Sequence, residues 1–252
     1  MSKVFSSLFL ALFLVSSFSA EAREVSYDDL LSTDVTGARR FIKSQRDVDG
    51  RRAVVAVLDT GVDMSIAGLT KTPDGGVKVI EARDFTGQGT IHLEDAEVAL
   101  EGSEKVLKTG DGVVRGHLLL AEKPSDFLLG FIRESDFANS HVDDVNNDGS
   151  LGGLFAVLLG KTTDQNGKEN WKLWVDTDGD GHVDDESAMV DYSVARKYFQ
   201  LKGFAGSDGV PLLAFAPTLA PERKEVELHF ADGSHGSHVA GIAAGYQLEG
   251  RK

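Results

Sequence analysis

Residues 53–61 read Ala-Val-Val-Ala-Val-Leu-Asp-Thr-Gly, and this stretch sets the architecture expected of the chain. Six apolar residues in a row predict a strand buried on both faces, which is typical of a parallel sheet covered by helices. Active sites of open α/β sheets lie at the carboxyl ends of strands, where Asp59 stands. Residues 77–85 (VKVIEARDF) predict a second strand. We therefore expect an α/β fold with Asp59 at its functional edge, although Asp and Gly are also common in ordinary turns.

The composition of the 252-residue chain excludes several classes of function. It has 26 Lys and Arg against 40 Asp and Glu, a net charge of −14, so we expect no nucleic-acid partner. The absence of cysteine rules out disulfides, thiolate–zinc sites, iron–sulfur clusters and a cysteine nucleophile. With 41% hydrophobic residues, the chain can form a substantial core.

The first 22 residues have the pattern of a signal peptide. Lys3 supplies the positive charge, residues 8–15 (LFLALFLV) the apolar run, and Ala20-Glu21-Ala22 a small-residue cleavage site. Such a run is too short to span a bilayer, which takes about 20 apolar residues. The sequence predicts an exported protein, secreted or periplasmic, with no membrane association once residues 1–22 are removed.

The middle of the chain predicts a different kind of structure. Apolar runs at residues 127–132, 154–159 and 171–175 predict strands, and Asn166-Gly167 between the last two is a hairpin signal. Strands that follow one another without helices favour an antiparallel module, so we expect a β-rich insertion over residues 90–210.

The later part of the chain carries a second motif that holds a histidine. Residues 187–201 predict a helix, residues 225–230 (EVELHF) a strand, and Ser234 the N-cap of a helix over residues 235–246. A general base needs one ring nitrogen fixed by a carboxylate while the other faces a nucleophile, and His235 at the helix start suits this role. We expect His238 to be structural and hydrogen-bonded beneath the site.

The two motifs together resemble those of the subtilisin-like serine peptidases. Ala-Val-Leu-Asp-Thr-Gly-Val-Asp (56–63) matches the Asp motif and His-Gly-Ser-His-Val-Ala-Gly (235–241) the His motif. Several stretches between Thr36 and Gly87 are also similar to the tripeptidyl-peptidase II and pyrolysin type, which has a long insertion between the motifs. They are Thr36-Gly37-Ala38, Asp49-Gly50-Arg51, Thr72-Pro73-Asp74-Gly75 and Asp84-Phe85-Thr86-Gly87.

The resemblance implies a fold, a chemistry and a substrate class. Residues 23–89 and 211–252 would form a partial subtilisin-like parallel sheet with flanking helices around the inserted module. Asp59 would be the triad carboxylate, His235 the general base, and a protein or peptide the substrate.

The resemblance also has a gap, because the family's nucleophile lies in a Gly-Thr-Ser segment after the His motif. No Gly-Thr-Ser occurs in this sequence. We therefore expect a fragment that lacks the catalytic serine and is inactive alone. Either a continuation of the reading frame or a separately encoded C-terminal half would complete it. An aspartic peptidase remains an alternative, since Asp-Thr-Gly after two apolar residues also marks that class, and a homodimer would pair two copies of Asp59.

Two acidic loops predict a structural calcium site. Carboxylates at positions 1, 3 and 5 followed by glycine match the first half of an EF-hand loop. The first loop contains Asp176, Asp178 and Asp180, and the second contains Asp144, Asn146 and Asp148. Position 12, where a Glu is expected, is Ser187 in one and Phe155 in the other. The alternative is a pair of solvated turns, and a non-catalytic calcium-binding module is the corresponding alternative function.

Overall fold

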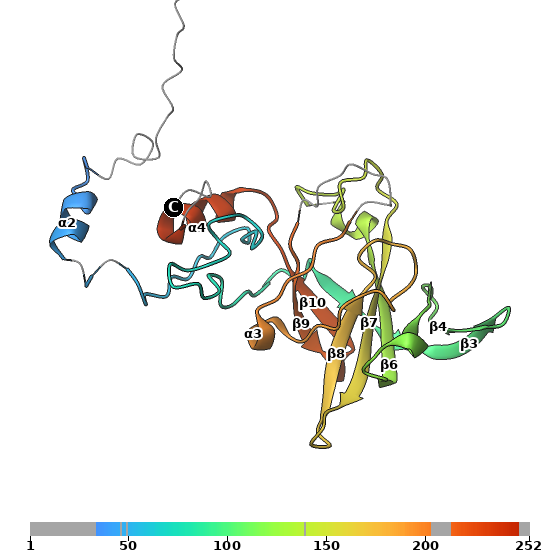
Figure 1. The fold of residues 1–252 in the computed structure, drawn as a ribbon. Coiled ribbons are helices and arrows are strands. Elements are labelled where there is room, and N and C mark those ends of the chain that lie inside the picture. Colours follow the sequence, from blue (N-terminus) through green and yellow to red (C-terminus); the bar gives the residue numbers. More distant parts are fainter. Residues whose placement is uncertain (1–33, 46, 49, 139, 203–212, 247–252) are drawn as a thin grey trace, which may run out of the picture. The chain divides into compact units, whose positions relative to one another are not determined.

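The computed structural model describes residues 34–45, 47–48, 50–138, 140–202 and 213–246, drawn in colour in Figure 1. The chain divides into two units, residues 1–54 and 55–252. The signal peptide expected at residues 1–22 lies outside the described residues. None of the helices in the described part is long and apolar enough to cross a membrane.

The described part of the first unit contains the short helix α2 (Ala38–Ser44). It begins after Gly37, whose left-handed backbone (φ 77°) glycine adopts without steric cost. No residue of α2 is buried, so packing inside this unit contributes little to the helix.

The second unit is built mainly from antiparallel strands in three sheets (Figure 1). The sheets have the orders β1-β10-β9, β2-β6-β7-β8 and β3-β4-β5. The strands are β1 (Thr90–His92), β2 (Glu94–Asp95), β3 (Glu97–Glu101), β4 (Glu104–Lys108), β5 (Val113–Val114), β6 (Ser125–Arg133), β7 (Leu154–Thr163), β8 (Glu169–Val175), β9 (Ala216–Ala220) and β10 (Glu225–His229). The helical segments are η1 (His117–Leu119), η2 (Glu134–Phe137), α3 (Tyr192–Ala195), η3 (Pro221–Arg223) and α4 (His235–Ala244).

The four-stranded sheet is covered on both faces by hydrophobic clusters. Val157 and Leu159 of β7 pack in one cluster with Val226 of β10. Leu158, which points to the opposite face, packs in the other cluster with Leu107 of β4. This alternation follows from the two-residue period of a strand. Alternate side chains of the continuous apolar run of β7 therefore pack in two different hydrophobic clusters, one on each face of the sheet.

The expected parallel sheet is not found among the described strands, all of whose pairings are antiparallel. Residues 53–58 form no strand, and Val54, Val55 and Leu58 are 76%, 53% and 89% exposed. Residues 77–85 form no strand either. A parallel strand needs strands beside it and helices over its faces, and no described strand pairs with either segment. The prediction of a parallel sheet is therefore wrong for the described residues, which form sheets with a few short helices.

The strands expected after residue 90 are confirmed. β6 covers residues 127–132, and β7 and β8 form a hairpin whose turn contains Gly167 (φ 79°). The helix expected over residues 187–201 is wrong, because only α3 forms there. Met189 instead forms a backbone bridge with Leu173, so part of this segment extends the sheet region.

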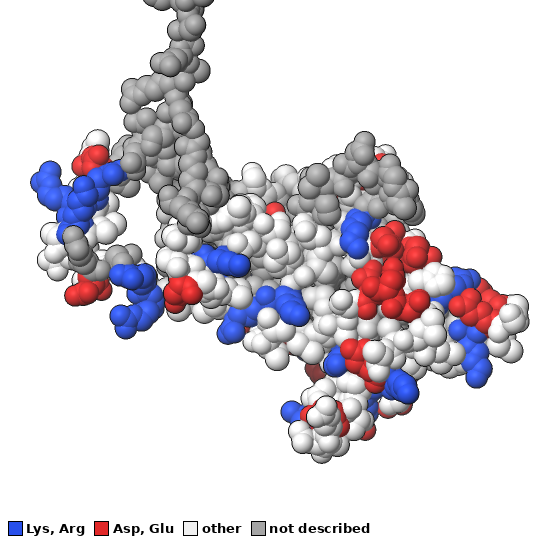
Figure 2. All heavy atoms as spheres, viewed as in Figure 1, with Lys and Arg blue, Asp and Glu red and all other residues white. Residues whose placement is uncertain are grey.

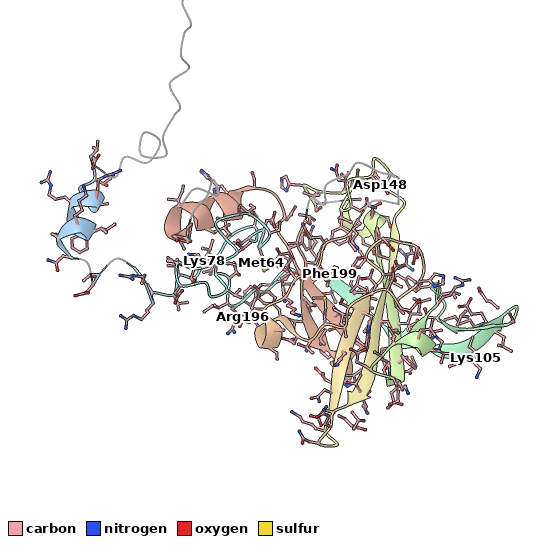
Figure 3. All side chains as sticks on the ribbon, viewed as in Figure 1. Met64, Lys78, Lys105, Asp148, Arg196 and Phe199 are labelled. Carbon is pink, nitrogen blue, oxygen red and sulfur yellow. The ribbon has the colours of Figure 1, made fainter. Side chains whose placement is uncertain are left out.

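The segment between Asp59 and Gly89 contains no strand and is held by individual contacts. Met64, labelled in Figure 3, packs with buried Tyr192 and Ala216. The hydroxyl of Tyr192 donates to the carbonyl of Val79 at 2.6 Å. These contacts fix the segment that carries Asp59 beside the strands.

Candidate active site

The two sequence motifs, 176 residues apart, meet at one point. Nδ1 of His235 lies 2.7 Å from Oδ1 and 2.9 Å from Oδ2 of Asp59. An ionised carboxylate only accepts hydrogen bonds, so Nδ1 carries a proton, and Nε2 is the nitrogen that can act as a base in the neutral ring. The expected hydrogen bond between Asp59 and His235 is confirmed, and their catalytic roles remain predictions.

Asp59 is oriented by the residue that follows it. The backbone N–H of Thr60 donates to Oδ1 of Asp59 at 2.8 Å, and the Thr60 hydroxyl donates to the same oxygen at 3.3 Å. The hydrogen bond from His235, followed by that from the Thr60 backbone, holds the pKa of Asp59 below its usual value of 3.8. The Asp59 side chain is 15% exposed and that of His235 73% exposed. An ionised, fixed carboxylate thus supports an accessible imidazole.

Two glycines allow the motifs to come this close. A Cβ atom on Gly61 would lie 2.1 Å from the carbonyl oxygen of Phe230, and one on Gly236 would lie 2.1 Å from that of Gly61. Gly61 also has a positive φ of 91°, which favours glycine. The start of α4 therefore packs directly against the Asp-Thr-Gly turn.

Two further polar contacts support the pair and were not evident from the sequence. The buried hydroxyl of Ser237 accepts the backbone N–H of Asp63 at 2.8 Å. Oδ1 of Asp232 accepts the backbone N–H of His141 at 2.7 Å. Their partners are 174 and 91 residues apart, so no local pattern marks them.

The roles expected of the other α4 residues are only partly met. Ser234 occupies the N-cap position, but its side chain makes no capping hydrogen bond. His238 is exposed and makes no side-chain hydrogen bond to a described residue, so its expected place beneath the site is wrong. The ring lies on the solvent side of α4, whereas Gly236, Ser237 and Ala240 are buried. Within the described part of the chain, no serine hydroxyl is hydrogen-bonded to His235.

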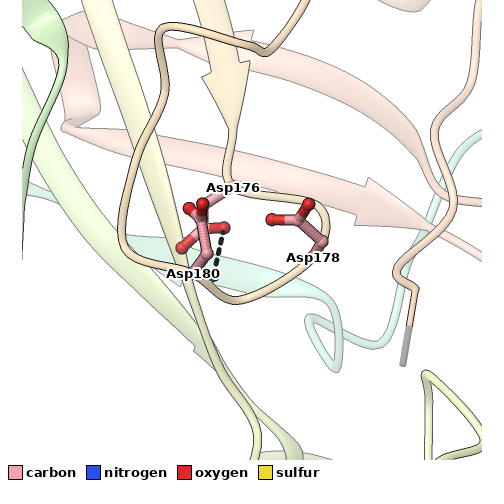
Figure 4. A group of neighbouring side chains, drawn as sticks. All are labelled: Asp176, Asp178 and Asp180. Atoms are coloured by element: carbon pink, nitrogen blue, oxygen red, sulfur yellow. Dashed lines mark hydrogen bonds between the residues drawn. The ribbon is translucent and has the colours of Figure 1, made fainter. Parts of the chain in front are cut away.

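The acidic loop after β8 gathers three carboxylates (Figure 4). One oxygen from each of Asp176, Asp178 and Asp180 lies within 4.8 Å of the others. Asp176 is 1% exposed, and burial raises its pKa to about 6. Oδ1 of Asp178 is buried without a hydrogen-bond partner among the described residues. Figure 2 shows carboxylates gathered over this loop. Oxygen ligands of this number and kind fit a hard cation such as Ca²⁺.

The second acidic loop has the same backbone arrangement. Asp176 accepts the N–H groups of the fifth and sixth loop residues at 3.1 and 2.9 Å, and Asp144 does so at 3.0 and 2.9 Å. Asn146 is 1% exposed and donates from Nδ2 to Asp148, labelled in Figure 3, at 2.9 Å. The repeated sequence pattern therefore produces a repeated local structure.

A glutamate braces each acidic loop, and the sequence did not indicate this role. Glu186 accepts the backbone N–H and the hydroxyl of Thr177, both at 2.6 Å. Glu134, 1% exposed, accepts the N–H groups of Val145 at 3.0 Å and Gly153 at 2.7 Å. Glu186 is thus engaged inside its loop, one position before the place where an EF-hand has its final ligand.

Comparison with known proteins covers most of the chain. Pyrolysin from Pyrococcus furiosus is 30% identical over 233 residues, which are 85% of this chain and 16% of pyrolysin. Tripeptidyl-peptidase 2 from Arabidopsis thaliana is 24% identical over 260 residues, 83% of this chain and 19% of that protein. A crystal structure of tripeptidyl peptidase 2 matches with a TM-score of 0.54 at 20% identity, over 82% of this chain and 20% of that one. No family model matches the sequence.

These relatives define the class: their similarity supports a subtilisin-like serine peptidase. The chain is related to pyrolysin and tripeptidyl-peptidase 2, as the stretches between Thr36 and Gly87 indicated. The chain spans no more than about a fifth of the length of these relatives.

Proposed function

We propose that Asp59 and His235 are the carboxylate and the general base of a Ser–His–Asp peptidase that hydrolyses peptide bonds in proteins or peptides. The observation that carries this proposal is the contact of His235 Nδ1 with both carboxylate oxygens of Asp59, at 2.7 and 2.9 Å. The serine would come from polypeptide outside this sequence, either a continuation of the chain or a separately encoded half.

In this mechanism each residue of the pair has one task. Asp59 holds His235 in the tautomer whose Nε2 is unprotonated and stabilises the imidazolium that forms later. Nε2 removes the serine proton as the serine oxygen attacks the carbonyl carbon, and then gives that proton to the leaving amine. In the second half of the reaction, water takes the place of the serine hydroxyl: Nε2 removes a proton from water as the water attacks the acyl group, and the serine is released with that proton.

The uncovered apolar segment supports completion by further polypeptide. Val54, Val55 and Leu58 are exposed although they precede Asp59 in a continuous apolar run. Neighbouring strands supplied with the serine would cover these side chains and convert the segment into the interior strand that its sequence predicts.

The test is reconstitution with a serine-bearing polypeptide. The chain is expressed alone and together with the genomically adjacent polypeptide that carries Gly-Thr-Ser, and casein hydrolysis is measured. We expect activity only in the complete form, and a loss of roughly 10⁴-fold in kcat in Asp59→Asn, because the wrong tautomer then dominates. Asp185→Asn, an exposed carboxylate in another loop, serves as the control. Equal activity of Asp59→Asn and the unmodified protein would contradict the proposal.

The aspartic peptidase alternative requires Asp59 to share a proton with a second carboxylate. Paired aspartates share a proton between two carboxylates, whereas Asp59 is bound by a histidine that favours its ionised form. That alternative predicts inhibition by pepstatin and an acid optimum, while a serine mechanism predicts neither.

We propose in addition that the loop containing Asp176, Asp178 and Asp180 binds Ca²⁺ and stiffens the β-rich segment. The buried Oδ1 of Asp178, which has no hydrogen-bond partner in the described part of the chain, supports this, because such an oxygen is costly unless a cation is near. Asp144, Asn146 and Asp148 form a weaker second candidate, since their amide and backbone contacts already use several oxygens.

Calcium binding is tested by thermal unfolding. Millimolar Ca²⁺ should raise the melting temperature, and Asp178→Ala should remove most of that rise. Asp185→Ala, an exposed residue of the same connection outside the cluster, should leave the rise intact. Absence of any rise in the unmodified chain would favour the solvated-turn alternative.

We also propose that residues 1–22 direct export and are then removed, which would make the protein secreted or periplasmic. The support is the order of Lys3, the apolar run and Ala20-Glu21-Ala22. Amino-terminal sequencing of the exported protein should begin at Arg23. A cytoplasmic product that retains Met1 would contradict this.

A further inference from the structure

We propose that a pocket beside the β3–β4 hairpin binds a carboxylate carried on an apolar group about the size of one aromatic residue. The pocket has a volume of about 350 Å³ and contains none of the residues of the Asp59–His235 site or of the acidic loops. Its walls are Val98, Leu118, Pro124 and Phe127, with Lys105, Lys123 and His117 as the polar members.

The apolar walls give the pocket room for a hydrophobic group. Val98 on β3 and Leu118 on η1 are 61% and 62% exposed, and Leu100 and Leu119 beside them are 69% and 72% exposed. Adjacent exposed apolar side chains around a hollow are typical of binding sites. A volume of about 350 Å³ lies at the lower end of the range of natural ligand pockets, roughly 300–1,000 Å³.

The charge at the pocket favours an anion. Lys105, labelled in Figure 3, and Lys123 form no ion pair with any carboxylate of the described residues. The nearby carboxylates of Glu101 and Glu104 are engaged by Arg115 instead. The chain has a net charge of −14, yet these two lysines have no anionic partner within the described ranges and lie beside an apolar hollow, so they complement a negatively charged ligand.

His117 adds a buried polar group to the wall. It is 3% exposed, and its ring meets Phe127 edge-on at a centroid distance of 5.5 Å. Burial lowers the pKa of His117, so the ring is neutral near pH 7. Nδ1 of His117 is buried without a hydrogen-bond partner among the described residues. Leaving a buried acceptor unpaired costs less free energy than leaving a buried N–H donor unpaired. The proton therefore belongs on Nε2, which leaves a neutral donor for a ligand oxygen.

The three polar groups together specify the ligand chemistry. Two ammonium groups and one neutral N–H donor suit an anionic oxygen group such as a carboxylate, and the apolar walls favour one that is attached to a hydrophobic body. Such a carboxylate has two sources, a free acid or the carboxyl-terminal residue of a peptide, and the experiment separates them.

The experiment measures binding by calorimetry with three probes: N-acetylphenylalanine, its amide, and a hexapeptide that ends in phenylalanine. We expect the acid to bind and the amide to bind at least about 10-fold more weakly, because a charge-assisted hydrogen bond is lost. Lys105→Ala and Lys123→Ala should each weaken binding of the acid by about 3- to 10-fold. His117→Phe, which keeps the ring packing on Phe127 and removes the donor, should weaken it similarly.

Controls and outcomes follow from the same geometry. Lys108→Ala removes a lysine from β4 outside the pocket and should leave binding within about twofold, and melting temperatures confirm that each variant is folded. Binding of both acid and hexapeptide would assign the pocket to peptide carboxyl termini, and binding of the acid alone would assign it to a free acid. No binding of either, equal binding of the amide, or an equal loss in Lys108→Ala would overturn the proposal.

Discussion

At the scale of single residues, the contact between Asp59 and His235 depends on two glycines as much as on the hydrogen bond itself. Gly61 and Gly236 have no Cβ, and that absence lets the turn and the helix touch backbone to backbone. Any larger residue would push α4 away from Asp59. The geometry of the pair is thus set partly by residues that carry no chemistry.

The first prediction concerns Gly236→Ala. Its added Cβ would lie 2.1 Å from the carbonyl oxygen of Gly61, which is far inside van der Waals contact with rigid backbone. We expect a loss of about 1–3 kcal/mol in the free energy of unfolding, measured by urea denaturation. Gly152→Ala is the matched control, because its Cβ would meet only the Ser150 hydroxyl at 3.6 Å. Equal stability of the two variants would contradict the close approach.

The second prediction concerns buried histidines and pH. Burial lowers the pKa of His229 and of His117 below 6.5. As pH falls through 6.5, the unfolded chain binds protons first, so the free energy of unfolding decreases by at most about 1.4 kcal/mol per pH unit for each histidine. This stability is complete above pH 6.5 and is lost as pH falls toward the lowered values. Urea denaturation at several pH values from 7.5 to 5 should show the decrease.

A variant pair tests the assignment to His229. His229→Gln cannot titrate and should show a smaller pH dependence. His92→Gln, whose side chain is 80% exposed in the native protein, should behave like the unmodified chain. Identical slopes in all three proteins would show that buried histidines do not control acid stability.

The sequence predicted the two principal site residues for a definite physical reason. Asp59 and His235 each belong to a local motif, so neighbouring residues indicate their roles without knowledge of the fold. Ser237 and Asp232 act through partners far away in the chain, and their roles appear only once the backbone is folded.

At the scale of elements, two similar apolar runs differ in structure: one forms a buried strand and the other forms no strand. Residues 154–159 form the first part of β7; all of them pair with β6, and residues 157–159 also pair with β8. Residues 53–58 are equally apolar but have no strand beside them among the described residues. An apolar run indicates that both faces of a strand can be buried. It does not show whether other strands and helices lie beside that strand to bury them.

Hydrogen exchange provides the third prediction. Amides of residues 156–159 should exchange at least about a thousandfold more slowly than those of residues 55–58, because only the former lie in a central, buried strand. Residues 98–100 of the short, exposed β3 provide an intermediate reference. Slow exchange at residues 55–58 in the isolated chain would mean that they already form a paired strand.

At the scale of the whole molecule, a carboxylate and a base are present without an identified nucleophile. Ser237 is buried and bound to the backbone of Asp63, and Ser234 starts α4 without a capping bond. Neither is hydrogen-bonded to His235 in the structure. Among the described residues, the candidate pair Asp59 and His235 therefore has no serine placed to donate a proton to it.

The fourth prediction is that residues 23–252 alone do not react with a fluorophosphonate probe. Such a probe labels serines activated by a neighbouring base, and a complete subtilisin-type enzyme serves as the positive control. We expect no label on the isolated chain. Stoichiometric labelling that disappears in His235→Ala would show that a serine of this chain completes the site.

The pairing of β1 with β10 has a consequence for changes in the length of the segment between these two strands. Thr90 lies opposite Glu227, and the N–H of Leu228 donates to the carbonyl of Gly89 at 2.8 Å, so the long excursion between them departs and returns at adjacent points. Inserted segments whose ends lie together are tolerated because they leave their host undisturbed. A change of length inside this excursion, outside the contacts that Tyr192, Ala216 and His141 make, would therefore leave its two ends in place.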